Sequence, residues 1–154
     1  MNIINFIIGL ALLVLTMASP GAAFANDSKS EVLTAVHEMW DHASKADVDA
    51  MFSKAPDNHT YVMAGHPLWS KQETLGLYGL AFDGVVKQHL ETHKEQVTLL
   101  SDTVALYVAD MHYSQFDVSE QPLESGPYVI TVVLKKVNGH WLNMHSHQSF
   151  PATN

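Results

Sequence analysis

The dipeptide Asn138-Gly139 constrains the fold of this chain more than any other feature. Both residue types tolerate the positive φ angles of a two-residue type I′ turn, and alternating apolar residues flank the pair on both sides. The pattern predicts a β-hairpin in which Val137 pairs with His140. Side chains alternate between the two faces of a strand, so five side chains of the second strand are expected to share a face. They are Trp141, Asn143, His145, His147 and Ser149.

The same turn predicts what lies opposite these five residues. Counting back from Val137, the preceding strand would present apolar side chains to them. These are Tyr128, Ile130, Val132 and Leu134. Two imidazoles would then lie between apolar walls, as in a ligand pocket. Two interpretations of His147 stay open: it holds a ligand oxygen or moves a proton, or it is a buried structural histidine bonded to its neighbours.

The N-terminal segment has the pattern of a secretory signal peptide. Residues 3–15 are apolar apart from Asn5, and the helix-breaking Ser19-Pro20-Gly21 and the A-x-A triplet Ala23-Phe24-Ala25 follow. We therefore expect a signal peptide over residues 1–25, cleaved after Ala25, and a periplasmic or secreted domain over residues 26–154. An uncleaved membrane anchor is the alternative; after cleavage no stable membrane anchor is expected.

Composition excludes several classes of function. The formal net charge is −8, and all eight basic residues are lysines. Nucleic-acid binding requires clustered Lys and Arg, so a nucleic-acid partner is not expected. The chain has no cysteine, which excludes disulfides and thiol chemistry. The ten histidines are the natural starting point for a hypothesis about function.

The order of the predicted elements is helices first and strands afterwards. The capping boxes Ser28–Glu31 and Ser70–Glu73 each predict the start of a helix, and Asp47 predicts a short helix between them. The first helix would bury Val32, Val36, Met39, Trp40 and Ala43. A short strand is predicted at 59–63 and longer strands at about 85–100, 103–116, 128–137 and 140–150. Such an order indicates an α+β domain with its helices on one face of a curved sheet.

Several of these segments resemble SnoaL-like domains of the nuclear transport factor 2-like superfamily. They are Ala46–Phe52, Ser101–Ala105, and Trp141 with His147-x-Ser149. The resemblance implies a cone-shaped, curved antiparallel sheet packed over three N-terminal helices, the cystatin-like architecture, with a pocket at its open end and homodimers formed through the outer face. In such a pocket, His147 and His145 are the candidate catalytic residues. The candidate ligand-binding residues are Ser149, Asn143, Tyr128, Trp141, Trp40 and Tyr61.

A second set of polar residues follows from a predicted turn at Ser101-Asp102. If Leu100 pairs with Thr103, His93 faces Asp110 and Glu91 faces His112. The candidate metal ligands of this cluster are His93, His89, His112 and Asp110, at the mouth of the pocket. The alternative, which alternating polar residues on a strand favour, is that these are solvated cross-strand pairs. In that case the opposite face, with Leu90, Tyr107, Met111 and Tyr113, is the interior.

Three functions are compatible with this sequence. The first is an exported domain that binds a small, largely apolar molecule, with no cofactor expected and a divalent metal left open. The second is a cofactor-free isomerase, cyclase or dehydratase with a histidine base. The third is a dimeric association module with a vestigial pocket. A fold alone does not decide among them.

Overall fold

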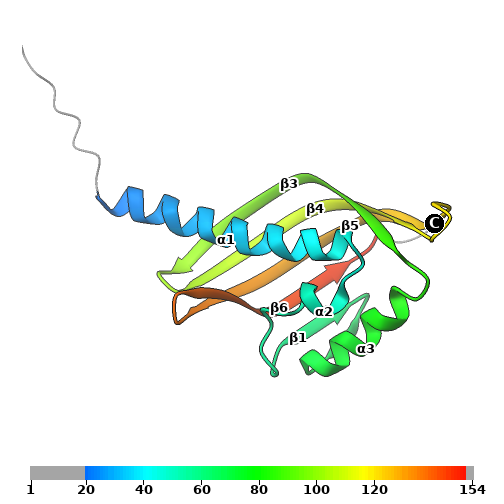
Figure 1. Ribbon diagram of the computed structural model, residues 1–154. Helices are drawn as coiled ribbons and strands as arrows, with labels where there is room; N and C mark the ends of the chain where they lie inside the picture. Colours follow the sequence, from blue (N-terminus) through cyan, green and yellow to red (C-terminus); the bar gives the residue numbers. More distant parts are fainter. Residues whose placement is uncertain (1–19, 152–154) are drawn as a thin grey trace, which may run out of the picture.

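The computed structural model describes residues 20–151, which form three helices and one six-stranded sheet (Figure 1). The elements in chain order are α1 (Pro20–Ser44), α2 (Val48–Met51), β1 (Thr60–Met63), β2 (His66–Leu68), α3 (Lys71–Ala81), β3 (Lys87–Ser101), β4 (Val104–Phe116), β5 (Pro122–Val137) and β6 (His140–Ser149). Residues 1–19, most of the predicted signal peptide, lie outside the described residues. None of the described helices combines the length and the apolar character that crossing a membrane requires.

Helix α1 begins earlier than predicted, at Pro20 rather than at the capping box Ser28–Glu31. Proline is favoured in the first turn of a helix, and the alanines that follow Pro20 have the highest helix propensity, so the helix extends through this segment. The predicted buried stripe is confirmed. Its residues Val32, Val36, Met39, Trp40 and Ala43 are all buried.

The sheet has the strand order β2-β1-β6-β5-β4-β3. All neighbouring strands are antiparallel except β1 and β6, which run parallel with Tyr61 opposite Ser146. The predicted antiparallel sheet is therefore a mixed one. Figure 1 shows the helices in front of this curved sheet, with α1 lying along it. The α+β cone expected from the sequence is confirmed.

Local sequence signals correctly placed one tight turn and the starts of two helices. Asn138 and Gly139 have φ angles of 50° and 82°, and Val137 pairs with His140 as predicted. The Asp47 side chain accepts a hydrogen bond from the Ala50 amide at 3.0 Å and begins α2. The Ser70 hydroxyl accepts one from the Glu73 amide at 3.1 Å and begins α3. These bonds satisfy amides that the first turn of a helix leaves free.

A bulge in β6 changes which of its side chains face inward. Leu134 pairs with Asn143, but the preceding Val133 pairs with His145, so the alternation shifts by one residue between them. The Asn143 amide donates instead to the Lys54 carbonyl at 3.1 Å, which fixes the bulge. Trp141 and Asn143 face inward as predicted, but beyond the bulge Ser146 and Gln148 are the buried residues. The prediction that His145, His147 and Ser149 share the inner face was wrong.

Two further irregularities shift β3 against β4. The register changes near Leu100 and again near His93, and Ser101 rather than Leu100 begins the pairing, with Val104. Asp110 therefore pairs with Lys94 instead of His93, whereas Glu91 pairs with His112 as predicted. Because of the second shift, Val97 and Leu99 face inward, whereas His89, Glu91 and His93 are exposed on the outer face. The interior face is the one with Tyr107 and Met111, both fully buried.

Strand β5 begins at Pro122, well before the predicted residue 128. The chain between the strands predicted at 103–116 and 128–137 makes a tight turn, because the Asp117 carboxylate accepts hydrogen bonds from the amides of Ser119 (2.8 Å) and Gln121 (2.9 Å). The extension of β5 carries Glu124 along the sheet, on the same side of the strand as Tyr128.

Candidate functional site

A cavity of about 260 Å³ opens between the helices and the inner face of the sheet. Trp40 and Ala43 of α1, Met51 of α2, and Tyr78 and Ala81 of α3 form its helical side. Ile130 and Leu90 belong to its sheet side. The walls are mainly apolar and aromatic, as is usual for a site that binds a small organic molecule.

Two tyrosines and a glutamine form a buried hydrogen-bonded cluster at the cavity. The hydroxyls of Tyr61 and Tyr78 lie 2.6 Å apart. Gln148 Oε1 lies within hydrogen-bond distance of both hydroxyls, at 2.7 Å from Tyr61 and 3.1 Å from Tyr78, so the two hydroxyl protons are shared among three contacts. Burial raises the pKa of both phenols, so they stay neutral. Tyr78 and Gln148 line the cavity, whereas Tyr61 lies behind them.

A second pair of amides lies on β3 and β4. Gln115 Nε2 donates to Gln88 Oε1 at 3.1 Å, and both side chains are buried and line the cavity. This bond uses one donor of Gln115 and one acceptor of Gln88. A primary amide has two N–H donors and an oxygen acceptor, so groups on both side chains are left to bind a ligand. The cavity thus offers neutral hydrogen-bonding groups within an apolar wall.

Aromatic rings and one carboxylate surround the mouth of the cavity. The Tyr113 ring centroid lies 5.8 Å from that of Tyr128 and 6.4 Å from that of Phe150. The Tyr113 hydroxyl donates to Glu124 Oε1 at 2.8 Å. Burial, and next the bond to Glu124, raise the pKa of Tyr113 to about 12. Among the described residues that line the cavity, Glu124 is the only acid, and there is no lysine or histidine.

The three candidates at the end of β6 lie on the outer face of the sheet. His147 and Ser149 are exposed, and they pair with Thr131 and Val129 of β5. His145 Nδ1 lies 2.8 Å from the Thr60 hydroxyl, and burial lowers the pKa of His145. None of the three lines the cavity.

The other predicted ligand-binding residues separate into two groups. Trp40 and Tyr128 line the cavity as predicted, and Tyr61 supports it from behind. Asn143 and Trp141 are buried elsewhere: Asn143 bonds to the Ser146 hydroxyl at 2.9 Å, and Trp141 Nε1 donates to Glu31 at 3.1 Å. These two side chains support the structure around the bulge and the middle of α1.

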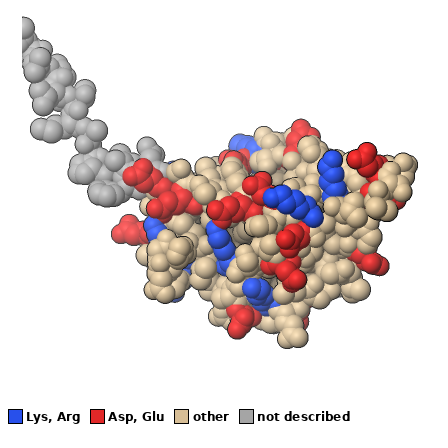
Figure 2. All heavy atoms as spheres, in the orientation of Figure 1, with Lys and Arg blue, Asp and Glu red and all other residues tan. Residues whose placement is uncertain are grey.

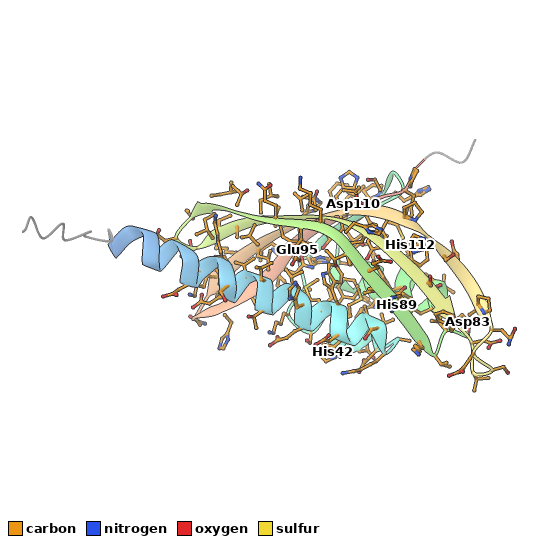
Figure 3. All side chains as sticks on the ribbon, turned by 90° about the horizontal axis from the view of Figure 1, so that it is seen from above. His42, Asp83, His89, Glu95, Asp110 and His112 are labelled. Carbon is orange, nitrogen blue, oxygen red and sulfur yellow. The ribbon has the colours of Figure 1, made fainter. Side chains whose placement is uncertain are left out.

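The four candidate metal ligands do not converge. His89, Asp110 and His112 are spread along β3 and β4 (Figure 3), and His93 Nδ1 lies 3.7 Å from Glu91. Within residues 20–151, no three side chains of His, Cys, Asp or Glu form a group that could hold a metal ion. Their arrangement is that of solvated side chains on neighbouring strands, the alternative considered for them in the sequence. Figure 2 shows acidic side chains spread between the lysines on one face, in line with the net charge of −8.

Sequence reasoning missed the polar groups that line the cavity, namely Tyr78, Gln148, Gln88, Gln115 and Glu124. Tyr78 lies on an apolar face of α3, a position that indicates burial and does not by itself indicate ligand binding. Regular alternation along β6 predicts that Gln148 faces away from Asn143, but the bulge turns it inward, and that bulge depends on a bond to Lys54 in another part of the chain. The glutamines of β3 and β4 follow no motif that could have identified them.

Comparison with known proteins identifies the family. Residues 32–153 match the family model for a SnoaL-like domain. No curated protein matches the chain. Among solved structures, a putative dehydratase of the NTF2-like family from Streptomyces avermitilis aligns with a TM-score of 0.72 and 16% identity, over 84% of this chain and 99% of the other.

Two other structures with the same fold bear different names. A ketosteroid isomerase-like protein from Erwinia carotovora atroseptica has a TM-score of 0.69 and 17% identity, over 83% of this chain and 99% of the other. The association domain of CaMKII from C. elegans has a TM-score of 0.66 and 17% identity, over 80% of this chain and 96% of the other. At these identities the likeness establishes the fold alone.

Proposed function

The chain belongs to the SnoaL-like domain family, and we propose that it is an exported protein whose cavity binds a small, largely apolar molecule. One observation carries the proposal: the cavity of about 260 Å³ combines apolar and aromatic walls with buried neutral anchors at Tyr78 and Gln148. Such a combination gives affinity through apolar contact and orientation through a few hydrogen bonds. The site needs no cofactor to do this.

Binding is favoured over catalysis by a histidine base because no histidine lines this cavity among the described residues. A general base must reach the proton that it removes within hydrogen-bond distance, directly or through one water. His145 and His147 lie on the other face of the sheet. Among the described residues that line the cavity, the exposed carboxylate of Glu124 is the one candidate base, so an enzymatic reaction is the second candidate function.

The size of the cavity predicts which molecules bind. An engineered apolar cavity of about 150 Å³ holds benzene. A cavity of about 260 Å³ should therefore hold a bicyclic molecule such as coumarin, whose two oxygens can accept hydrogen bonds, but not a whole steroid. We expect coumarin to bind and testosterone not to bind, as measured by calorimetry on the purified protein.

The same preparation tests export and identifies a natural ligand. Native mass spectrometry of protein expressed with its leader and purified from the periplasm should give a polypeptide that begins at Asn26, together with any organic molecule retained in the cavity. Retention of the first 25 residues would contradict cleavage. Tight binding of testosterone, or failure of every mono- and bicyclic probe to bind, would contradict the proposed pocket.

We also propose that two copies associate through the outer face of the sheet. Val108 and Val129 are 37% and 43% exposed on that face, and with Leu106 they line a shallow cavity of about 380 Å³. Polar and charged residues that include Lys94 and Asp110 also line this cavity, and two such faces, apolar at the centre with a polar rim, can bury the roughly 1,200 Å² of a stable interface.

A charge on this face should therefore separate the dimer. We expect wild-type protein to sediment as a dimer and Val129→Glu to sediment as a monomer, because an unpaired carboxylate is costly to bury. Val118→Glu is the matched control, since Val118 is exposed in the β4–β5 turn, away from this face. Identical monomeric sedimentation of all three proteins would exclude the dimer.

A further inference from the structure

We propose, building on the proposed function, that the ligand of this pocket is an organic cation, with an apolar body inside the cavity and an ammonium group at its mouth. The juxtaposition that carries this proposal is the ring cluster of Tyr113, Tyr128 and Phe150 beside the carboxylate of Glu124. Aromatic faces and a carboxylate attract the same kind of group, a poorly hydrated cation.

The three rings are placed as a cluster around the mouth. Their centroids lie 5.8 Å apart for Tyr113 and Tyr128, 6.4 Å for Tyr113 and Phe150, and 6.3 Å for Tyr128 and Phe150. Tyr113 is nearly perpendicular to each of the others, with interplanar angles of 68° and 76°. Rings at such angles do not stack into one flat layer, so a methylated ammonium can contact more than one ring face.

Glu124 supplies a fixed negative charge at the same place. The Tyr113 hydroxyl donates to its Oε1 at 2.8 Å, which holds the carboxylate next to the rings. A carboxylate has two oxygens and about four acceptor sites, so this single bond leaves it able to contact a cation. Because the pKa of the Tyr113 phenol is raised, its hydroxyl stays protonated and keeps donating this hydrogen bond.

No positively charged side chain is found among the described residues that line the rest of the site. The lining includes no lysine or histidine among the described residues, and its other polar groups are neutral amides and phenols. The protein as a whole carries a formal charge of −8, which raises the local concentration of cations. An anionic ligand would meet Glu124 without a compensating base, so this site selects against anions.

Two isosteric probes separate the charge from the shape of a ligand. Phenyltrimethylammonium and tert-butylbenzene have the same heavy-atom skeleton and differ in the nitrogen or carbon at the branch. We expect the cation to bind at least about tenfold more tightly than the neutral molecule, as measured by calorimetry. Benzenesulfonate, an anion of comparable size, should not bind.

Two single-residue variants test whether Glu124 is the source of the preference for the cation. In Glu124→Gln the preference for the cation should fall at least about fivefold while the affinity for tert-butylbenzene stays within about twofold. Glu91→Gln removes the same charge from the outer face of β3 and should leave the preference unchanged. Thermal unfolding of both variants checks that they are folded.

The outcomes distinguish this proposal from the one on which it rests. If the two isosteres bind with equal affinity, the pocket is real and its selectivity for cations is refuted. A preference that Glu91→Gln and Glu124→Gln reduce equally reflects the net charge of the protein and also refutes the assigned site. If neither isostere binds but coumarin does, the cation proposal is refuted and the pocket stands; if coumarin fails to bind as well, the proposed function itself is refuted.

Discussion

Replacing Ala81 with tryptophan is expected to abolish coumarin binding and leave the fold intact. Ala81 is the last residue of α3, its side chain is exposed, and it lines the cavity. An indole at this position would occupy the space of the ligand. Forcing atoms into an occupied site costs about 3 kcal/mol, so the affinity should fall by about 100-fold.

Leu80→Trp is the matched control for this experiment. Leu80 precedes Ala81, is 78% exposed and does not line the cavity. We expect it to bind coumarin within about twofold of wild type, since surface substitutions of this kind change stability by no more than about 0.5 kcal/mol. Calorimetry measures both affinities, and urea unfolding compares the stabilities. Equal loss of binding in both variants, or unchanged binding in Ala81→Trp, would contradict the assigned pocket.

A large loss of stability on acidification is expected from His59. Its side chain is fully buried, and neither ring nitrogen has a hydrogen-bond partner within residues 20–151. Burial, and secondly the charge of His145, lower the pKa of His59 from 6.5 to about 4. The imidazole is consequently neutral in the folded protein, packed against Phe52 and Tyr61 with ring centroids at 5.7 Å and 6.1 Å.

The direction of this pH effect follows from proton binding by the two states. Above about pH 6.5, His59 is neutral in both states and stability is complete. Below that pH the unfolded chain binds the proton and the folded protein does not, so stability falls until the folded protein also binds it near pH 4. A lowering from 6.5 to about 4 corresponds to a loss of about 3 kcal/mol over this interval.

Urea unfolding between about pH 7 and pH 4 measures the effect. The His59→Leu variant should lose about 3 kcal/mol less than wild type over this range, because leucine has a similar size and binds no proton. Phe52→Leu, which alters the neighbouring ring without a titrating group, should lower stability by the same amount at every pH. If the His59→Leu and wild-type curves run parallel, the imidazole is not the source of the acid sensitivity.

Local chemistry was sufficient to predict much of the fold. The Asn138-Gly139 turn, the helix starts after Asp47 and Ser70, and the buried stripe of α1 depend on residues within a few positions of one another. Such local interactions can be predicted from short sequence patterns. The parallel pairing of β1 with β6 joins segments far apart in the chain, and it was not predicted.

The site was predicted less well because its register depends on bulges. Side chains alternate strictly between the two faces of a sheet only while the pairing of the strand is regular. One extra residue in a bulge moves all the following side chains to the opposite face. The bulge in β6 is held by a hydrogen bond from the Asn143 amide to the Lys54 carbonyl, and no local sequence pattern predicts this bond. The inward positions of Trp40 and Tyr128 agree with the sequence pattern because no irregularity lies between these residues and the local signals used to place them.

Methyl NMR of the protein labelled with [¹³C]methyl-methionine tests the central claim most directly. Met51 and Met63 line the cavity, whereas Met144 does not. Titration with coumarin should shift the methyl signals of Met51 and Met63 and leave that of Met144 unchanged, because aromatic rings shift only nearby nuclei. Shifts confined to Met144, or binding that leaves Met51 and Met63 unaffected, would show that the ligand binds elsewhere and would contradict the pocket assigned here.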